Sequence, residues 1–199
     1  MVDLAPFEEY CEFGGDRVYL LLAIARAKEN EDRPSGDSPT FRRVVEAEGD
    51  LAATADELAH AASRFDAHHR LYLTVNARDA LGATFELKRS LDDWIEGRIH
   101  GDEGVRGKFK RVDREFLSTL QSDGSRDETN FLFDLDDATA ADRDRLRSRL
   151  AEHTTVSLER ETPNGYHLVT EPFDYNRLET DVAYELKTDG LVFVSYLGE

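Results

Sequence analysis

The stretch Phe131-Leu132-Phe133-Asp134-Leu135-Asp136-Asp137 opens the part of the chain whose fold the sequence predicts most clearly. Its apolar and aromatic residues indicate a strand, and the pattern then changes to that of a helix over residues 138–153. Further strands are expected at 155–160, 166–170, 182–186 and 191–197, with a connection at 172–178 that can be helical. This order of elements is close to that of ferredoxin-like and RNA-recognition-motif sheets.

The sequence before residue 126 predicts a helix-rich part with short strands. Two glycines and Asp16 indicate the start of a helix with an apolar stripe through Val18, Leu21, Leu22 and Ala25. Helices are also expected at 50–64, after the capping residue Asp79 and at 105–120, strands at 40–46 and 70–76, and a loop at 29–39. We therefore expect an α+β fold. A helix-rich N-terminal α/β part, 1–125, would cover or extend a mixed ferredoxin-like sheet in a C-terminal part, 126–199, as one compact unit.

The chain is strongly acidic. It has 42 Asp and Glu residues against 25 Lys and Arg residues, which gives a formal net charge of -17, and the excess acid is spread along the length. Such a surface, with arginine far more frequent than lysine, resembles that of proteins from haloarchaea and their viruses. In molar salt the Debye length falls to about 3 Å, so local patches of charge decide the partners. The negative charge therefore does not exclude nucleic acid.

Several classes of protein are excluded by composition. The single cysteine, Cys11, allows neither an intramolecular disulfide nor a cysteine-rich zinc site. The longest apolar run, at 18–25, is far too short to span a membrane, and the first ten residues show no targeting signal. We expect a cytoplasmic protein without a membrane partner.

Two aspartates in the opening strand form a candidate metal site. Asp134 and Asp136 are two residues apart, so both point to the same face of a strand. Neighbouring carboxylates repel each other unless a positive group lies between them, and Mg²⁺ or Mn²⁺ would be such a group. An alternative is that Asp136 or Asp137 caps the helix that follows, but this role would leave Asp134 unexplained.

A histidine follows in the next pair of strands. Pro163-Asn164-Gly165 has the composition of a turn, and His167 lies just after it in a strand. The imidazole could contact a phosphate or a metal ion. The alternative is a histidine held by hydrogen bonds with no functional role.

Together these residues resemble the catalytic core of the archaeo-eukaryotic primase and primase-polymerase superfamily. Phe133-Asp134-Leu135-Asp136 matches its hydrophobic-Asp-x-Asp motif, and Gly165-Tyr166-His167 matches its small-x-His motif, over residues 130–197. The resemblance implies a metal-dependent nucleotidyltransferase. In it Asp134, Asp136 and His167 would be catalytic, the aspartates would hold Mg²⁺ or Mn²⁺, and Gly165-Tyr166-His167 would contact the nucleotide. A third acid is expected on a later strand, where the candidates are Asp181, Glu185 and Asp189.

Another short motif resembles that of nucleic-acid ligases but does not indicate a ligase. Lys187-Thr188-Asp189-Gly190 matches the Lys-x-Asp-Gly of nucleic-acid ligases, but the strands expected downstream of that motif find no room in the nine residues that follow. We expect Asp189-Gly190 to be the turn of a hairpin between the last two strands.

A basic cluster stands out in the acidic chain and predicts contact with a nucleic-acid backbone. In one continuous helix, Arg106, Lys110 and Arg114 would lie on one face. The alternative is a solvated helix face paired with nearby acids. The cluster consists of Arg106, Lys108, Lys110, Arg111 and Arg114.

Three functions remain open from the sequence. The first is primase-polymerase-like nucleotidyl transfer or processing of nucleotides and nucleic acids. The second is a non-catalytic viral or plasmid accessory module that binds nucleic acid or protein. The third is a metal-dependent nuclease or phosphohydrolase that uses the same acids.

Overall fold

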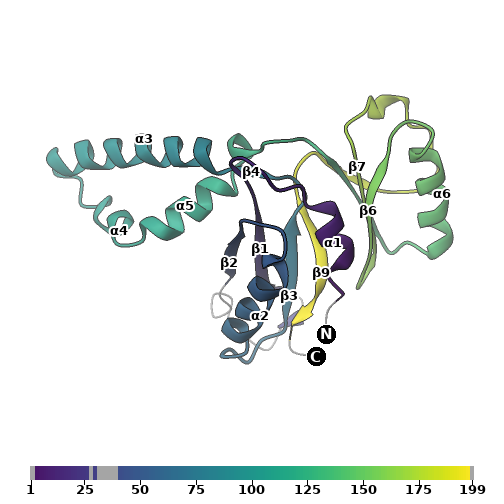
Figure 1. The fold of residues 1–199 in the computed structure, drawn as a ribbon, viewed down its shortest axis with the longest axis horizontal. Coiled ribbons are helices and arrows are strands. Elements are labelled where there is room, and N and C mark those ends of the chain that lie inside the picture. The colour runs from purple at the N-terminus through teal and green to yellow at the C-terminus, as the bar shows by residue number, and fades with distance from the viewer. Residues whose placement is uncertain (1–2, 27–28, 31–39, 198–199) are drawn as a thin grey trace.

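The structure is a computed structural model that describes residues 3–26, 29–30 and 40–197. Most of the loop predicted at 29–39 lies outside the described residues. Figure 1 shows two sheets and a helical arm that projects from the first sheet. The predicted α+β class is confirmed. Within the described residues, no helix combines the length and apolar character needed to cross a bilayer.

The first sheet is built mainly from the N-terminal half of the chain. Its strand order is β2-β1-β3-β9, and the short β4 pairs with the start of β1. Helix α2 (Asp50–Ala62) packs on one face, where Leu51 and Leu58 are buried in the core. The strands are β1 (Arg17–Ala25), β2 (Phe41–Val45), β3 (His69–Thr74), β4 (Arg78–Asp79) and β9 (Leu191–Leu197).

Strand β1 corrects the helix predicted after Asp16. The strand is covered on both faces: Tyr19 and Leu21 are buried in one apolar cluster, and Leu20 and Leu22 in another. A strand buried on both faces has a continuous apolar run without alternation. Because such a run also fits a helical stripe, periodicity alone could not separate the two structures.

The second sheet has the predicted ferredoxin-like order. Its strands are β5 (Phe131–Asp136), β6 (Val156–Thr162), β7 (Gly165–Thr170) and β8 (Glu185–Lys187), arranged β6-β7-β5-β8. If β5, β6, β7 and β8 are numbered 1 to 4, the order read from β8 across the sheet is 4-1-3-2, as in ferredoxin-like folds. All of its pairings are antiparallel. The prediction of a mixed sheet is therefore wrong. Helix α6 (Ala140–Leu150) covers the outer face (Figure 1), and η3 (Tyr175–Arg177) precedes β8.

The last strand corrects the predicted hairpin, and it crosses the division expected at residue 126. Strand β9 leaves the second sheet and pairs antiparallel with β3 of the first sheet. Its Val192 and Val194 are buried in the same cluster as Leu132 and Val169 of the second sheet. Helix α1 (Ala5–Tyr10) lies beside β9 and β6 (Figure 1) and adds Phe7 to this cluster. The two sheets therefore share one core.

A buried polar junction sits where the chain crosses between the sheets. Arg78 has a side chain only 2% exposed, and its guanidinium donates to both carboxylate oxygens of Asp189, at 2.9 and 2.8 Å. Asn76 donates to the backbone oxygen of Thr188 at 3.1 Å and accepts a hydrogen bond from the Asn130 backbone N–H. Asp189 is thus an acceptor for long-range partners, which explains why Asp189-Gly190 does not form the predicted hairpin turn.

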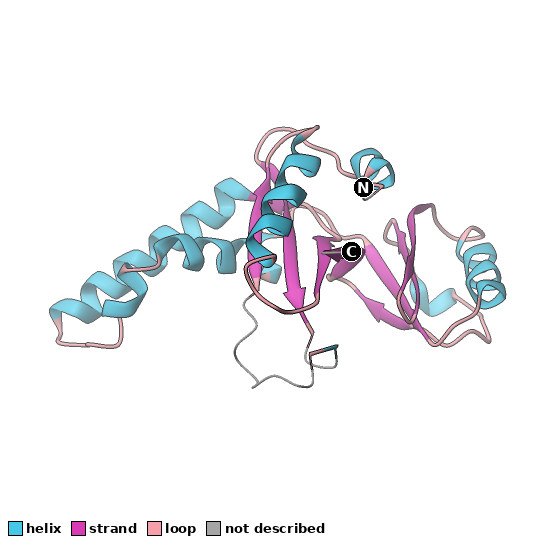
Figure 2. Cartoon of the chain, turned by 90° about the horizontal axis from the view of Figure 1, so that it is seen from below, coloured by secondary structure: helices cyan, strands magenta, loops and turns pink. Residues whose placement is uncertain are grey.

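The arm consists of α3 (Ala80–Ile99), α4 (Arg106–Phe109) and α5 (Val112–Leu120), and the chain leaves it through η2 (Asp123–Ser125) (Figures 1 and 2). The predicted cap of α3 is confirmed, because Asp79 accepts a hydrogen bond from the Gly82 backbone N–H at 2.8 Å. The helix predicted from 105 to 120 is broken, since Arg111 has a non-helical backbone. The basic residues before and after the break therefore do not share one helix face.

Candidate functional site

Asp134, His167 and Lys187 come together on the face of the second sheet that is turned toward the first. Asp134 lies opposite His167 in the pairing of β5 with β7, and the His167 Nε2 to Asp134 Oδ1 distance is 3.3 Å. Lys187 comes from β8 on the other side of β5, with its Nζ 2.7 Å from Asp134 Oδ2. The predicted pairing of an aspartate with the histidine is therefore present, and a lysine is added to it.

The imidazole of His167 is engaged at both nitrogens. Its Nδ1 accepts a hydrogen bond from the Phe193 backbone N–H of β9 at 3.1 Å. The proton of a neutral ring must then lie on Nε2, which faces Asp134. On the neighbouring strand, Arg160 donates to the backbone oxygen of Val194, also in β9. His167 and Arg160 thus tie the second sheet to the first.

The ionised form of the Asp134 carboxyl group is strongly favoured. The hydrogen bond from His167 and the ammonium group of Lys187 hold the pKa of Asp134 well below its usual range, although partial burial acts in the opposite direction. Burial alone would lower the pKa of Lys187, but its hydrogen bonds to Asp134 and Glu185 raise it. Asp134 and Lys187 therefore form an ion pair, with Nε2 of His167 beside the Asp134 carboxylate.

Among the three candidates for a third acid, Glu185 is the one that joins this cluster. It lies opposite Asp134 in the pairing of β5 with β8, and its carboxylate is 2.9 Å from Lys187 Nζ. Asp189 is instead held by Arg78 in the buried junction. Asp181 is exposed and lies 3.8 Å from Arg145. The lysine ammonium thus occupies the place between two carboxylates where a cation would bind.

Asp136 and Asp137 do not join the cluster. Asp136 is exposed at the end of β5, opposite Gly165. Neither aspartate caps the helix that follows, because Thr139 caps α6 in a reciprocal box with Asp142. Asp137 instead has a positive φ of 55° and donates its backbone N–H to Asn164. The alternative role considered for these residues is therefore wrong.

The predicted Mg²⁺ or Mn²⁺ site can be tested against the donors. Both oxygens of Asp134 already accept hydrogen bonds from positive or N–H groups, and Asp136 is not drawn toward them. Across residues 3–26, 29–30 and 40–197, no three His, Cys, Asp or Glu side chains are grouped so that they could hold a metal ion. In this arrangement the residues do not fit a resident divalent ion.

Gly165 and Tyr166, the predicted nucleotide contacts, are both packed against other parts of the second sheet. A side chain at Gly165 would meet the Leu135 backbone oxygen at 1.8 Å, so only glycine allows the two strands to approach. Tyr166 points to the opposite face from His167, into the cluster under α6, and Arg143 lies over its ring at 5.0 Å. Neither residue faces the Asp134 cluster with a side chain.

The predicted basic cluster is dispersed by the break between α4 and α5. Arg106 pairs with Glu103 at 3.4 Å, and Lys108 lies over the Trp94 ring at 5.2 Å. Lys110 is exposed at the break. Arg111 and Arg114, however, lie just before and at the start of α5, a helix that contacts the edge strand β2.

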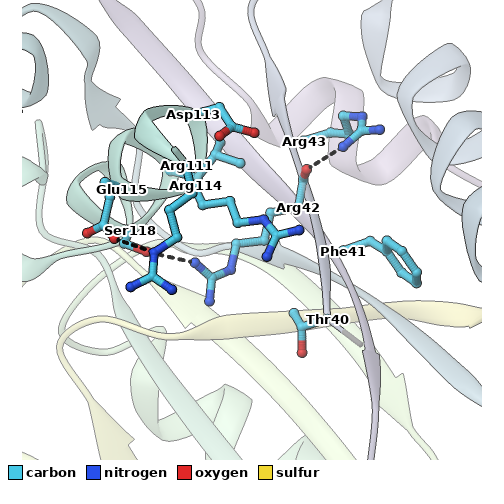
Figure 3. A pocket seen from close by; sticks show the side chains of 10 residues that line it. Thr40, Phe41, Arg42, Arg43, Arg111, Asp113, Arg114, Glu115 and Ser118 are labelled. Carbon is cyan, nitrogen blue, oxygen red and sulfur yellow. Dashed lines mark hydrogen bonds and ion pairs between the residues drawn. The ribbon is translucent and has the colours of Figure 1, made fainter. Parts of the chain in front are cut away.

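These two arginines line an open hollow of about 640 Å³ together with Arg42 and Arg43 from β2. Figure 3 shows the guanidinium groups of Arg42, Arg111 and Arg114 gathered in it, whereas Arg43 points away. Arg43 pairs with Glu57 of α2, as expected for the alternate residue of a strand. The complete lining is Thr40, Phe41, Arg42, Arg43, Arg111, Asp113, Arg114, Glu115, Leu117 and Ser118.

The gathered guanidinium groups are only partly neutralised. Arg111 pairs with Glu115 at 3.1 Å. Arg42 donates to the Ser118 hydroxyl at 3.2 Å, and neither Arg42 nor Arg114 has a carboxylate within 4.0 Å in the part of the chain that the structure describes. Sequence reasoning missed Arg42, because only the fold brings β2 next to α5. Its one signal was two adjacent arginines in a short strand of an acidic chain.

Comparisons of this chain with protein-family models, with curated proteins and with solved structures found no match.

Proposed function

We propose that this protein is an accessory module that binds the phosphate backbone of nucleic acid through the arginine hollow formed by Arg42, Arg111 and Arg114. The observation that carries the proposal is the convergence of three guanidinium groups on one open hollow that holds four arginines and two acids. Like charges that converge favour an anion between them. Guanidinium groups match phosphate oxygens with paired hydrogen bonds.

The open form of the hollow and the net charge of the chain are also compatible with binding to a nucleic-acid backbone. The hollow is open to solvent, so a continuing strand could enter and leave it. The chain carries a net charge of -17, which repels nucleic acid at long range in dilute salt. In concentrated salt that repulsion is screened within a few ångströms, and direct contacts with arginine decide binding.

Binding of labelled single-stranded DNA, duplex DNA and inorganic phosphate tests the proposal. The measurement is fluorescence anisotropy or calorimetry at several KCl concentrations in which circular dichroism shows a folded protein. The Arg42→Gln/Arg114→Gln variant should bind DNA at least about tenfold more weakly. With duplex DNA, the slope of log K against log salt should become shallower by about 0.9 for each phosphate that the variant no longer neutralises.

Arg149→Gln is the matched control, since Arg149 is an exposed arginine on α6 that pairs with Glu152. It should bind as the unsubstituted protein does. Equal DNA binding by the hollow variant and the unsubstituted protein, or equal losses in the hollow variant and the control, would refute the hollow as the site.

Metal-dependent nucleotidyl transfer is the second candidate. Its support is the meeting of Asp134, His167 and Glu185 on one sheet face, although Asp136 stays apart from them. Against it stands Lys187, whose ammonium fills the place of a cation. Primer extension and cleavage of labelled DNA with Mn²⁺, compared between the unsubstituted protein and Asp134→Asn, decide the case. Loss of a Mn²⁺-dependent product in the variant would favour this candidate.

A further inference from the structure

The outer face of α3 carries an apolar stripe that no other element covers. Among the described residues, four of the seven exposed large hydrophobic side chains belong to this helix. Their exposed fractions are 49% for Leu81, 55% for Phe85, 50% for Ile95 and 77% for Ile99. Figure 1 shows α3 along one side of the arm with α4 and α5 on the other.

The stripe follows a regular spacing. With Lys88 and Asp92, the four apolar residues stand at intervals of four, three, four, three and four residues. At 3.6 residues per turn, all six side chains fall within an arc of about 80° on the helix. Ala83 and Trp94, the buried residues of α3, lie roughly opposite that arc. The helix thus has two apolar faces, one packed within the arm and one open, and the open one has the pattern of a helix-pairing seam.

The stripe is also symmetric about its middle. Leu81 and Ile99 are equally far from Ser90, and so are Phe85 and Ile95, and Lys88 and Asp92. A second copy of α3 laid antiparallel along the first, with a two-fold axis near Ser90, would place apolar residues opposite apolar residues at both ends. In the middle, each Lys88 would face Asp92 of the other copy.

We propose that this protein forms a homodimer through antiparallel pairing of α3 with α3 of a second copy. Charge selects this arrangement. A parallel pairing in register would place Lys88 against Lys88 and Asp92 against Asp92, whereas the antiparallel pairing makes two salt bridges. The contact extends over about 27 Å, the length of the stripe at 1.5 Å per residue. A contact of this size is at the small end of stable interfaces, so the dimer dissociates at low concentration.

Sedimentation velocity in concentrated KCl tests the dimer. The mass of the unsubstituted chain is 22.6 kDa. The mass derived from sedimentation should be twice this value at high protein concentration and should fall to that of the monomer on dilution. Phe85→Glu should weaken the dimer about 100-fold or more while circular dichroism stays unchanged. A monomer at all concentrations, or an unchanged dimer in Phe85→Glu, would overturn the proposal.

Exchange of the charges at Lys88 and Asp92 distinguishes a loss of helix pairing from misfolding. Lys88→Asp should weaken the dimer, because two aspartates of one copy then face two of the other. The double variant Lys88→Asp/Asp92→Lys should restore the dimer, since each lysine again faces an aspartate. A double variant as weak as the single one would overturn the assigned pairing.

Disulfide trapping reports the orientation. Leu81→Cys and Ile99→Cys proteins, mixed and oxidised, should cross-link to each other, and neither should cross-link to itself. The unsubstituted protein, which keeps the buried Cys11, is the control for oxidation. Cross-linking of Leu81→Cys with itself would show a parallel pair and would overturn the antiparallel assignment.

Discussion

Asp134 owes its charged state to His167 and Lys187, and this gives a pH-dependent contribution to stability. Because its pKa is lowered in the folded protein, the contribution is present above the ordinary aspartate pKa of about 3.9 and is lost as the pH falls through the folded value. Asp134→Asn should lower the free energy of unfolding by about 1.5–3 kcal/mol at pH 7. Denaturant unfolding at a series of pH values should show this difference shrinking in acid.

Asp136→Asn is the control for that experiment. Its side chain is exposed on the same strand, two residues away, and so the same substitution should change the free energy of unfolding by less than about 0.5 kcal/mol. Equal effects of the two substitutions, or a constant difference between pH 7 and pH 3, would contradict the role assigned to Asp134.

Asp189 neutralises an arginine that is almost completely buried. Asp189→Asn would leave the Arg78 guanidinium, 2% exposed, without its charged partner. Loss of one member of a buried pair destabilises proteins by about 3–5 kcal/mol. Chemical denaturation should show a loss in that range. Glu86→Gln removes the partner of the exposed Arg89 and should lower stability by less than about 1 kcal/mol, so comparable losses would argue against the junction.

At the scale of single residues, the sequence predicted the members of the polar cluster only in part. Asp134 and His167 were expected on neighbouring strands, and their pairing follows from the register of β5 with β7. Lys187 escaped notice because its motif was judged only as a ligase signature. The Phe193 N–H that engages His167 comes from another sheet, and no local pattern indicates such a contact.

At the scale of elements, the start of α6 depends on one residue that the sequence analysis passed over. The Thr139 side chain accepts a hydrogen bond from the Asp142 backbone N–H at 3.3 Å, and the Asp142 carboxylate accepts one from the Thr139 N–H at 2.9 Å. Thr139→Ala should lower the free energy of unfolding by about 1 kcal/mol. Asp136→Ala provides the comparison, since Asp136 was the other aspartate considered as the cap and lacks the positive φ of Asp137. A larger loss in Asp136→Ala would restore the aspartate as the cap.

Elements marked by a capping residue, a turn or an aromatic strand pattern were predicted well, whereas the apolar strand β1 and the helix with a break were not. The strands β5 and β7 and the helices α2 and α3 begin within about two residues of their expected positions. Strand β1 was mistaken for a helix because its continuous apolar run also fits a helical stripe. The break at Arg111 depends on the packing of α4 against α3, where the Trp94 and Phe109 rings meet edge to face at 5.9 Å.

At the scale of the whole molecule, the order of strands in the second sheet was predictable because its four strands come from one continuous segment of the chain. The path of β9 was not. An Asp-Gly pair between two strands is a strong local signal for a hairpin. Here the carboxylate of Asp189 is bound by Arg78, more than a hundred residues earlier in the chain, and the last strand is directed to β3.

This path means that the two sheets should not fold separately. A fragment of residues 1–125 would lack β9 and leave β3 as an open edge, and a fragment of 126–199 would expose Val192 and Val194. We expect neither fragment to unfold cooperatively, because each lacks part of the shared core. Mixing the two should restore a cooperative transition, measured by circular dichroism on heating in concentrated KCl. A fragment that melts cooperatively by itself would show that the division at residue 126 separates two independent domains.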